Sequence, residues 1–294
     1  MKIQTLLVDG DILTYKAGFC LEETVSLIQN FDTGEAFEVT SKEDVMAILK
    51  AFEGDYCEVK QFKRIKENAM PVGFIIKMIL DSINVEHNER KIFITDTNIN
   101  NNFRKQLDPE YKQNRNKSHK PLLYAEAREA LVNEFDAIEV SGVEADDVLG
   151  ISQVDDTSII ASIDKDMMMI PGWHYNLNTK EIIHASDPGK LTLKDSKLKG
   201  FGFRWFCAQM LLGDVIDNVI GLHGYGPVKT NKLLKDLKTP KELFDKVASL
   251  YIQEGRKEDI TKNSQLLWIQ RNDYRSFFDY MEEHDHDRQP QTNS

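Results

Sequence analysis

The chain has 294 residues, 41% of them hydrophobic, and a formal net charge of −11 at pH 7. This length can bury a large core in one domain or in two smaller ones. The first apolar stretch meets Asp9 and Asp11 too early for a signal peptide or a membrane span, so we expect a cytoplasmic protein without a membrane partner. Three cysteines without a CxxC pair indicate neither a disulfide framework nor a zinc site.

The distribution of charge differs from its total. An acidic chain argues against a nucleic-acid partner, because phosphate binding normally shows a basic footprint. Positive charge is nevertheless concentrated in three stretches, at Arg104 to Lys120, Lys190 to Arg204 and Lys229 to Lys238. This pattern fits a metal-dependent enzyme that acts on nucleic acid, and it also fits an ordinary solvated surface.

Four short apolar runs, each bounded by polar or turn residues, predict buried strands. They are Thr5 to Val8, Ile92 to Thr95, Ala137 to Val140 and Ser158 to Ser162. Helical patterns lie between most of them. Alternating strands and helices predict the α/β class with a mostly parallel central sheet, in which functional groups gather beyond the carboxyl ends of the strands.

Other segments predict additions to this core. Ser26 to Thr40 alternates apolar and polar residues around Asp32-Thr33-Gly34 and predicts a hairpin of unknown role. Beyond Gly200 the strand signals fade, so we expect a catalytic core over 1–200 and a smaller helical subdomain over 201–280. The polar stretch 281–294 is expected to be a disordered tail.

Each predicted strand is followed by at least one acid. These acids are Asp9, Asp96, Glu144, Asp146, Asp147, Asp164 and Asp166. Neighbouring strand ends would bring them close together, where like charges raise one another's pKa unless cations compensate them. Hard divalent ions with oxygen ligands are the natural compensation, so the set predicts a Mg²⁺ site.

A local interpretation competes for each acid. Ser141 with Glu144 has the spacing of a capping box, and Asp146 and Asp147 would lie in the first turn of a helix, where the helix dipole favours anions. Asp9, Asp11 and Asp164 could likewise be turn formers or helix caps. Capping does not explain why all four strands end in acids, so the complete set favours a metal site.

Two further acids, Asp214 and Asp217, are spaced i and i+3 and would share one face of a helix end. They could complete a second metal site. Two ions about 4 Å apart are the usual arrangement for hydrolysis of a phosphodiester.

A glycine-rich hairpin follows these acids. Gly221, Gly224 and Gly226 precede Pro227, at a predicted first helical position, and Lys229. Glycines let the backbone approach a ligand, and the N–H groups at the start of a helix bind anions. The segment predicts a helix-hairpin-helix grip on duplex phosphates, although a tight turn alone would give the same pattern.

The segment 103–121 follows the strand that leads to Asp96 and is rich in basic residues around Tyr111. They are Arg104, Lys105, Lys112, Arg115, Lys117 and Lys120. Basic residues interleaved with an aromatic ring suit a single-stranded nucleic acid. A solvated loop is the alternative.

Together these motifs resemble the 5′-nuclease family: flap endonucleases, the 5′-nuclease domain of bacterial DNA polymerase I and, above all, phage 5′-to-3′ exonucleases. The resemblance rests on LLVDGD, ITDTNINNNFRKQLDPEYKQNR, GVEADDVLG, IIASIDKDMMMIP and LLGDVIDNVIGLHGYGPVKT. These segments occur in the family's order between Asp9 and about Lys235. The resemblance implies a PIN-like core, a helical arch at about 97–135 and a helix-three-turn-helix at Gly221 to Lys232.

The resemblance also implies roles for individual residues. The first metal would be held by Asp9, Asp96, Glu144 and Asp146, and the second by Asp147, Asp164, Asp166, Asp214 and Asp217. Lys112 and Arg115 would contact the scissile phosphate as catalytic residues. DNA would also be bound by Arg104, Tyr111, Gly221, Gly224, Gly226, Lys229 and Lys232, with Tyr111 stacking on a displaced base.

The implied reaction is Mg²⁺-dependent hydrolysis of DNA near a 5′ end, a flap or a nick, in the replication or repair of a bacterium or its phage. Mn²⁺ would substitute for Mg²⁺, and K⁺ would bind at the helix-three-turn-helix. The sequence leaves open whether exonuclease, flap-endonuclease or RNase H-like activity on RNA–DNA hybrids dominates. The sequence does not indicate the oligomeric state or the protein partners.

Two other functions remain open at this point. The segment LLVDGDIL predicts a strand that leads into a D-x-D motif. Haloacid-dehalogenase phosphatases also begin with such a motif, and its two acids would be Asp9 and Asp11 here. A non-catalytic DNA-binding module would use only the glycine hairpin and the basic stretches. The phosphatase interpretation leaves Glu144 to Asp147 unexplained, and the binding module does not need acids at strand ends.

Overall fold

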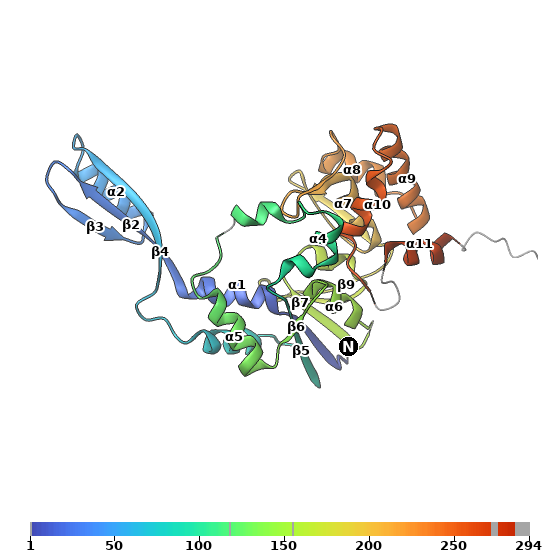
Figure 1. The fold of residues 1–294 in the computed structure, drawn as a ribbon, viewed down its shortest axis with the longest axis horizontal. Coiled ribbons are helices and arrows are strands. Elements are labelled where there is room, and N and C mark those ends of the chain that lie inside the picture. Colours follow the sequence, from blue (N-terminus) through green and yellow to red (C-terminus); the bar gives the residue numbers. More distant parts are fainter. Residues whose placement is uncertain (1, 118, 155, 272–275, 286–294) are drawn as a thin grey trace, which may run out of the picture. The chain divides into compact units, whose positions relative to one another are not determined.

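The computed structural model describes residues 2–117, 119–154, 156–271 and 276–285, without the side chains of Ile99, Asn116, Lys117 and Asp285. The chain forms two compact units, each with a sheet of its own (Figure 1). Unit 1 comprises residues 1–12, 83–118 and 135–294, and unit 2 comprises residues 13–82 and 119–134.

Unit 1 is built on a six-stranded sheet in the order β6-β5-β1-β7-β8-β9. All neighbours are parallel except β8 and β9. The strands are β1 Thr5–Asp9, β5 Glu89–Thr95, β6 Ile138–Val140, β7 Ser158–Ser162, β8 Gly172–Asn176 and β9 Ile182–Ala185. The first four confirm the strands predicted from apolar runs. β8 was not predicted because GWHYN mixes aromatic and polar residues instead of forming such a run.

Burial explains why these runs were readable. Every residue of β7 is buried, as are Leu6, Leu7 and Val8 of β1. Strands of a parallel sheet covered on both faces are continuously apolar instead of alternating. Helix α6 (Ala145–Ser152) packs against β1 and β5.

Short helices and two hairpins also belong to unit 1. They are η1 Ile99–Asn101, α4 Phe103–Leu107, η2 Gln113–Lys117, η3 Asp166–Met169, the hairpin β10 Lys190–Lys194 with β11 Lys197–Phe201, and the pair β12 Gly213–Asp214 with β13 Val219–Ile220. The β10–β11 hairpin lies in a stretch where no strand was predicted.

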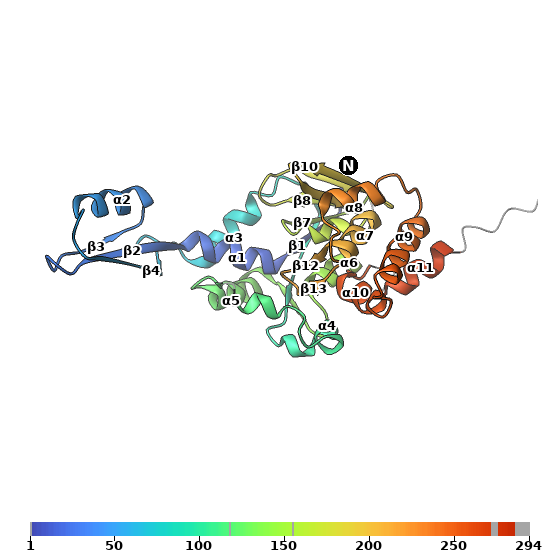
Figure 2. The same ribbon diagram turned by 90° about the horizontal axis from the view of Figure 1, so that it is seen from above.

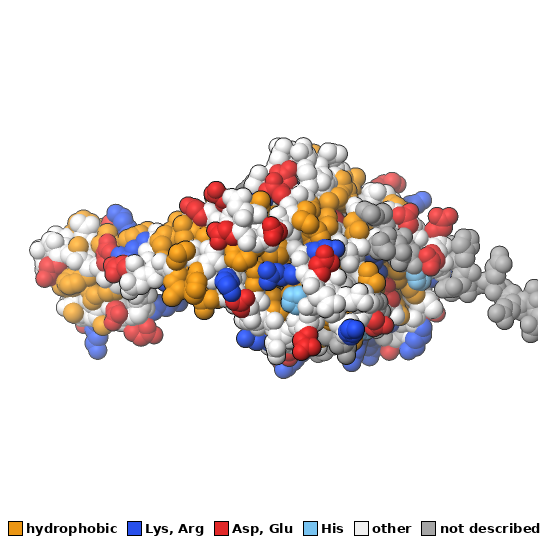
Figure 3. Space-filling view, turned by 90° about the horizontal axis from the view of Figure 1, so that it is seen from below, with side chains coloured by type: hydrophobic (Ala, Val, Ile, Leu, Met, Phe, Trp, Pro, Cys, Tyr) orange, Lys and Arg blue, Asp and Glu red, His pale blue; other side chains and the backbone are white. Residues whose placement is uncertain are grey.

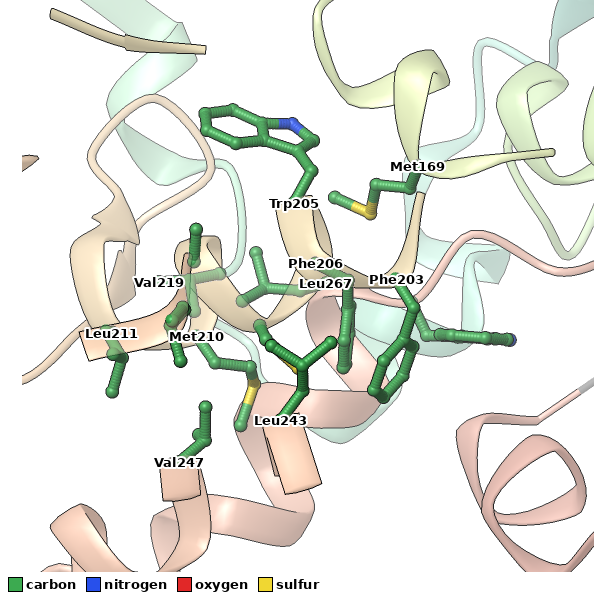
Figure 4. Close-up of a cluster of buried hydrophobic side chains, with 14 of the residues drawn as sticks. Met169, Phe203, Trp205, Phe206, Met210, Leu211, Val219, Leu243, Val247 and Leu267 are labelled. Carbon is green, nitrogen blue, oxygen red and sulfur yellow. The ribbon is translucent and has the colours of Figure 1, made fainter. Parts of the chain in front are cut away.

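The expected helical segment after residue 200 is present. Its helices are α7 Phe203–Leu212, α8 Pro227–Leu234, α9 Pro240–Gln253, α10 Asp259–Leu267 and α11 Phe277–Asp285. They pack around a core that includes Phe203, Phe206, Met210, Leu243 and Val247 (Figure 4). This segment belongs to unit 1 with the sheet, so the boundary expected near residue 200 falls inside that unit and stays a prediction.

The disordered tail was expected to begin at residue 281, which is too early. Helix α11 continues to Asp285, because its inner side is aromatic: Phe277 and Tyr280 are buried, and the His284 ring stacks on Tyr280 at 4.2 Å. The remainder of the expected tail, 286–294, lies outside the described residues.

Unit 2 holds the hairpin expected at Ser26 to Thr40, formed by β2 and β3, and extends it by a third strand, β4. Its elements are most of α1 Gly10–Leu21, β2 Glu22–Asn30, β3 Ala36–Val39, α2 Lys42–Ala51, β4 Cys57–Ile65, α3 Val72–Asp81 and most of α5 Tyr124–Phe135. The buried Asn30 organises the turn: its Oδ1 accepts from the N–H groups of Asp32 and Thr33, and its Nδ2 donates to Asp55.

Unit 2 also exposes large hydrophobic side chains, among them Met46, Tyr56, Phe74 and Met78. Hydrophobic patches are visible on one face of the molecule (Figure 3). Among the described residues, none of the helices has both the length and the apolar character to span a membrane.

The anchoring of α11 can be tested with two adjacent phenylalanines. Phe277 is 2% exposed and packs on Phe206 and Phe244, whereas Phe278 is 45% exposed. We expect Phe277→Ala to lower the free energy of unfolding by about 3–5 kcal/mol, because it opens a cavity in the aromatic core. Denaturant unfolding measures the loss. Phe278→Ala is the matched control, and equal losses in the two variants would contradict the described packing.

Candidate active site

The carboxyl ends of the central strands lie side by side in the sheet, as predicted. β1 lies between β5 and β7 in parallel register, and β6 follows β5 on the other side. Asp9 is the last residue of β1, Asp96 follows β5, and Asp164 follows β7 after one intervening residue. These acids therefore lie at one edge of the sheet, with the start of α6 beside them.

Asp9 is held by the backbone and by β7. Its Oδ1 accepts from the N–H of Ile12 at 3.0 Å, and its Oδ2 accepts from the Ser162 hydroxyl at 2.7 Å. Burial, together with the nearby charges of Asp11 and Asp164, raises the pKa of Asp9 from 3.8 to about 7. Asp9 therefore caps the following helix, which is one of the roles expected for it. It also lies close to the negative charges of Asp11 and Asp164.

Asp146 shows the crowding most clearly. Burial, followed by the charges of Asp9, Asp164 and Glu144, raises its pKa well above the ordinary value. Among the described residues, no side chain or backbone group donates a hydrogen bond to its carboxylate. Asp146 is half-buried. A half-buried carboxylate surrounded by like charges is stable as an anion only beside a cation, so the donor set fits a hard divalent ion.

The acids after β7 form a second group. The Asp164 carboxylate accepts from the N–H of Asp166 at 2.8 Å, and Asp166 also accepts from the side-chain amide of Gln209. Burial and the charge of Asp164 raise the pKa of Asp166 to about 7. Lys165 offsets part of this charge, since its Nζ lies 3.1 Å from Asp214 and 3.6 Å from Asp166. Neither Lys165 nor Gln209 was identified from the sequence, where neither stands in a distinctive pattern.

The placement of Asp214 and Asp217 differs from the expectation. They are not on a helix, because α7 ends at Leu212 and Gly213 follows with a φ of 73°. They belong instead to a tight turn in which Asp214 Oδ1 accepts from the N–H groups of Ile216 and Asp217, at 2.8 and 3.1 Å. The turn still directs Asp214 toward the second group, as its contact with Lys165 shows.

Asp96 and Ser141 also have unexpected partners. The Ser141 hydroxyl donates to Asp96 Oδ2 at 2.9 Å, so it does not cap α6. Glu144 is the residue that caps α6, and its N–H donates to Asp147 Oδ2 at 3.1 Å. The predicted capping box is therefore displaced by three residues.

The basic segment after α4 contacts the acids directly. Lys112 is buried, with its Nζ against Glu144 Oε1, and its backbone N–H donates to the carbonyl of Asp217. Arg115 donates through Nε and Nη2 to Asp217 Oδ1, at 3.0 and 2.7 Å. Although burial opposes ionisation, Lys112 and Arg104 hold the pKa of Glu144 at about 2.

Tyr111 is not placed for stacking on a base. It is 2% exposed, and its hydroxyl lies 3.2 Å from Glu144 Oε2 and 3.1 Å from Asp217 Oδ2. As the structure places it, the ring belongs to the core of unit 1 and the hydroxyl links two acids.

Arg104 has a structural position instead of the expected DNA contact. It is 2% exposed, and all five of its N–H donors are used within the protein. The acceptors are both oxygens of Asp147, Glu144 Oε2, and the carbonyls of Leu266 and Trp268. No donor is left for a phosphate.

Asp147 likewise does not have the position expected of a metal ligand. Its carboxylate is fully buried and accepts from Arg104, from the N–H of Glu144 and from the N–H of Gln270. The carboxylate is satisfied by protein donors. The helix-start interpretation, one of the two alternatives for this segment, is the one that applies to Asp147.

In the described part of the chain, no three His, Cys, Asp or Glu side chains are grouped tightly enough to hold a metal ion as they stand. The remaining ligand assignments, to Asp9, Asp96, Glu144, Asp146, Asp164, Asp166, Asp214 and Asp217, stay predictions.

The glycine-rich segment starts a helix as expected. Gly226 caps α8 and Pro227 is its first residue. Gly224 has a φ of 76°, which favours glycine. Lys229 and Lys232 are exposed on α8, and Lys229 Nζ lies 3.4 Å from the centre of the Tyr225 ring. The predicted contacts of this segment with DNA stay predictions.

Comparison with known proteins adds to this geometry. The sequence model of the family described as "5′-3′ exonuclease, N-terminal resolvase-like domain" matches residues 4–187, well over half of the chain. This range includes the acids from Asp9 to Asp166 and the basic segment 103–121.

Three curated relatives are similar at low identity. The exodeoxyribonuclease of Enterobacteria phage T3 is 31% identical over 134 residues, 42% of this chain and 41% of that protein. A 5′-3′ exonuclease of Buchnera aphidicola is 25% identical over 206 residues, 66% of this chain and 70% of that protein. The exonuclease of Escherichia phage T7 is 27% identical over 180 residues, 58% of this chain and 53% of that protein. The aligned part thus spans less than half of the phage T3 relative.

The Arg104–Asp147 pair allows a test of stability. We expect Arg104→Met to lower the free energy of unfolding by about 3–5 kcal/mol, because it leaves a buried carboxylate without its counter-ion. The double variant Arg104→Met with Asp147→Leu should recover part of the loss, since both charges are then gone. Urea unfolding compares the two. A double variant less stable than the single one would refute the assignment of a compensated buried pair.

The acid cluster predicts an unusual pH dependence in EDTA. Between about pH 4 and pH 7, folded Asp166 holds a proton that the unfolded chain releases, because the folded pKa is raised to about 7. Stability therefore falls as pH rises through this window. Between pH 5 and pH 8, we expect the Tm of Asp166→Asn to decrease less than the Tm of the wild-type chain. Each kcal/mol of repulsion that the substitution removes should reduce the decrease by about 2–4 °C.

Asp245→Asn is the control for this experiment, because the Asp245 side chain is 55% exposed on α9. Its Tm profile should follow that of the wild-type chain. Identical profiles for Asp166→Asn and the wild-type chain would show that the cluster is not electrostatically strained.

Proposed function

We propose that this chain, which belongs to the family of 5′-3′ exonucleases with an N-terminal resolvase-like domain, is a 5′-nuclease that hydrolyses phosphodiester bonds of DNA. The observation that carries the proposal is the set of acids at one sheet edge. Asp9, Asp146 and Asp166 have pKa values raised by burial and by their neighbours, and Asp146 has no hydrogen-bond donor among the described residues. Such a cluster costs stability without a cation, so we infer that its purpose is catalytic.

We propose Mg²⁺ as the cation, with Mn²⁺ able to substitute. Asp9, Asp96, Glu144 and Asp146 would hold one ion, and Asp164, Asp166, Asp214 and Asp217 a second. Two such ions supply an activated water and neutralise charge on the oxygens of the reacting phosphate. Oxygen-only donors at both groups suit Mg²⁺ better than a softer metal.

The residues of the chain prepare this site in two ways. Ser162 and the N–H of Ile12 orient the Asp9 carboxylate, and Gln209 orients Asp166. Lys112 and Arg115 bring positive charge to the acids, where they contact Glu144 and Asp217. With DNA bound, both cations could exchange a carboxylate for the scissile phosphate and stabilise the charge that develops on it.

The start of α8 supports a grip on duplex phosphates. The N–H groups near Gly224 and Gly226 and the exposed ammonium groups of Lys229 and Lys232 lie on one short segment. A helix start of this kind favours anions. We also propose that K⁺ would be held at this segment, where it would supply further positive charge toward a phosphate. Together with the match to the 5′-3′ exonuclease family, this grip supports our proposal that the substrates are DNA with 5′ ends, flaps or nicks.

We infer a role in DNA replication or repair, in the cytoplasm of a bacterium or of a phage-infected host. RNA–DNA hybrids belong to the substrate panel, because a backbone grip does not by itself distinguish them from DNA. The helical segment 201–280 would be the DNA-binding part, next to a catalytic part that ends near residue 200.

A labelled panel of a 5′ flap, a nicked duplex, a blunt duplex and an RNA–DNA hybrid tests the proposal. We expect the wild-type chain to release 5′ products with Mg²⁺ and to be inactive with EDTA. Asp166→Asn should lose at least about 10²-fold in rate, because an acid of the second group loses its charge. Arg115→Ala should cleave more slowly while α8 still binds duplex.

Asp245→Asn, on the exposed face of α9, is the activity control. Cleavage in EDTA, or full activity of Asp166→Asn, would rule out the metal-dependent mechanism. Faster turnover of a small aryl phosphate than of DNA would instead favour a phosphatase.

A further inference from the structure

The hairpin β10–β11 has one apolar and one basic face. Leu191 and Leu198 are buried in the core of unit 1. The alternate positions point away from that core, and all of them except the half-buried Phe201 are exposed. The exposed residues are Lys190, Thr192, Lys194, Lys197 and Lys199. We name the four lysines the lysine strip.

The charge of the lysine strip is not balanced by the protein. Within the described residues, none of the four ammonium groups forms an ion pair with an acidic side chain. The chain as a whole has 48 acids and only 37 basic residues, so an ordinary solvated face would carry acids as well. Lys194 and Lys197 are direct cross-strand partners, and like charges in this position destabilise a hairpin. A repulsive face that the fold retains points to an anionic ligand.

The strip is rigidly supported. Five residue pairs fix the register, and the turn residues Asp195 and Ser196 have φ values of 49° and 59°, as in a two-residue turn of the primed kind. The buried Arg204 holds the base of the hairpin by donating to the carbonyl of Gly189 at 3.0 Å. Helix α8 packs against both strands (Figure 2). The strip is therefore a preformed surface beside the helix that carries Lys229 and Lys232.

The chemistry of the strip suits a phosphate backbone. From Lys190 to Lys194 it extends about 13 Å, roughly the rise of four base pairs of duplex. Phe201, the cross-strand partner of Lys190, is half-buried, so the described residues 190–201 offer no exposed aromatic ring for stacking on bases.

We propose that the outer face of the β10–β11 hairpin binds the phosphates of duplex DNA, as a contact surface separate from the segment Gly221 to Lys232. This inference rests on the proposed nuclease function, because it assumes DNA as the ligand. The strip would hold duplex that the start of α8 alone does not cover.

Replacement of the four lysines by glutamine tests this surface, because it removes the positive charges and keeps polar side chains. Fluorescence anisotropy measures binding of a labelled blunt duplex in EDTA, where no cleavage occurs, from 50 to 200 mM salt. We expect the slope of log K against log salt to decrease in magnitude by about 3 to 4, at about 0.9 per phosphate contact. Thermal unfolding of the variant verifies that the hairpin is intact.

The matched control replaces Lys42, Lys50, Lys60 and Lys77 of unit 2 by glutamine, which changes the net charge equally. Its slope should equal that of the wild-type chain. Equal slopes for the strip variant and the control variant, or no duplex binding by the wild-type chain, would overturn the inference. A separate cleavage assay distinguishes failure of the proposed function from failure of this inference. If the proposed function is wrong, the wild-type chain will cleave no DNA with Mg²⁺.

Discussion

The buried ion pair between Arg104 and Asp147 is the contact on which the arrangement of the site depends. Arg104 belongs to α4, Asp147 to α6, and the carbonyls of Leu266 and Trp268 to the chain at the end of α10. Three segments that are distant in sequence therefore meet at one guanidinium. Since Asp146 belongs to α6 and Glu144 caps it, this pair fixes both acids relative to α4 and the end of α10.

The same region shows how the protein distributes opposite charges. Glu144 has three cationic or hydroxyl partners, Lys112, Arg104 and Tyr111, and its pKa is lowered to about 2. Asp9, Asp146 and Asp166 lack comparable compensation, and their pKa values are raised. Lys112 and Arg104 thus compensate the charge of Glu144, whereas Lys165 offsets only part of the charge of Asp166. This asymmetry supports a metal-dependent nuclease better than a set of helix caps.

Charge also explains how an acidic chain could bind DNA. Its negative residues are partly concentrated at the sheet edge, where metal ions would compensate them, whereas lysines occupy α8 and one face of the β10–β11 hairpin. The net charge of −11 is therefore a poor guide to the local surface that a duplex would meet.

The sequence by itself determined the parallel sheet, because its strands are continuously apolar, and it determined that acids would follow them. It also determined the start of α8, since Gly226 and Pro227 act locally. Only the tertiary structure decided which acids remain available: Asp147 and Arg104 look like functional residues in sequence, yet they pair with each other, and protein groups satisfy the rest of their hydrogen bonds. It also placed Asp214 and Asp217 in a turn, because Gly213 ends α7 through its packing against Gly221. Local patterns are read from neighbours in sequence, whereas the partner of a buried charge comes from anywhere in the chain.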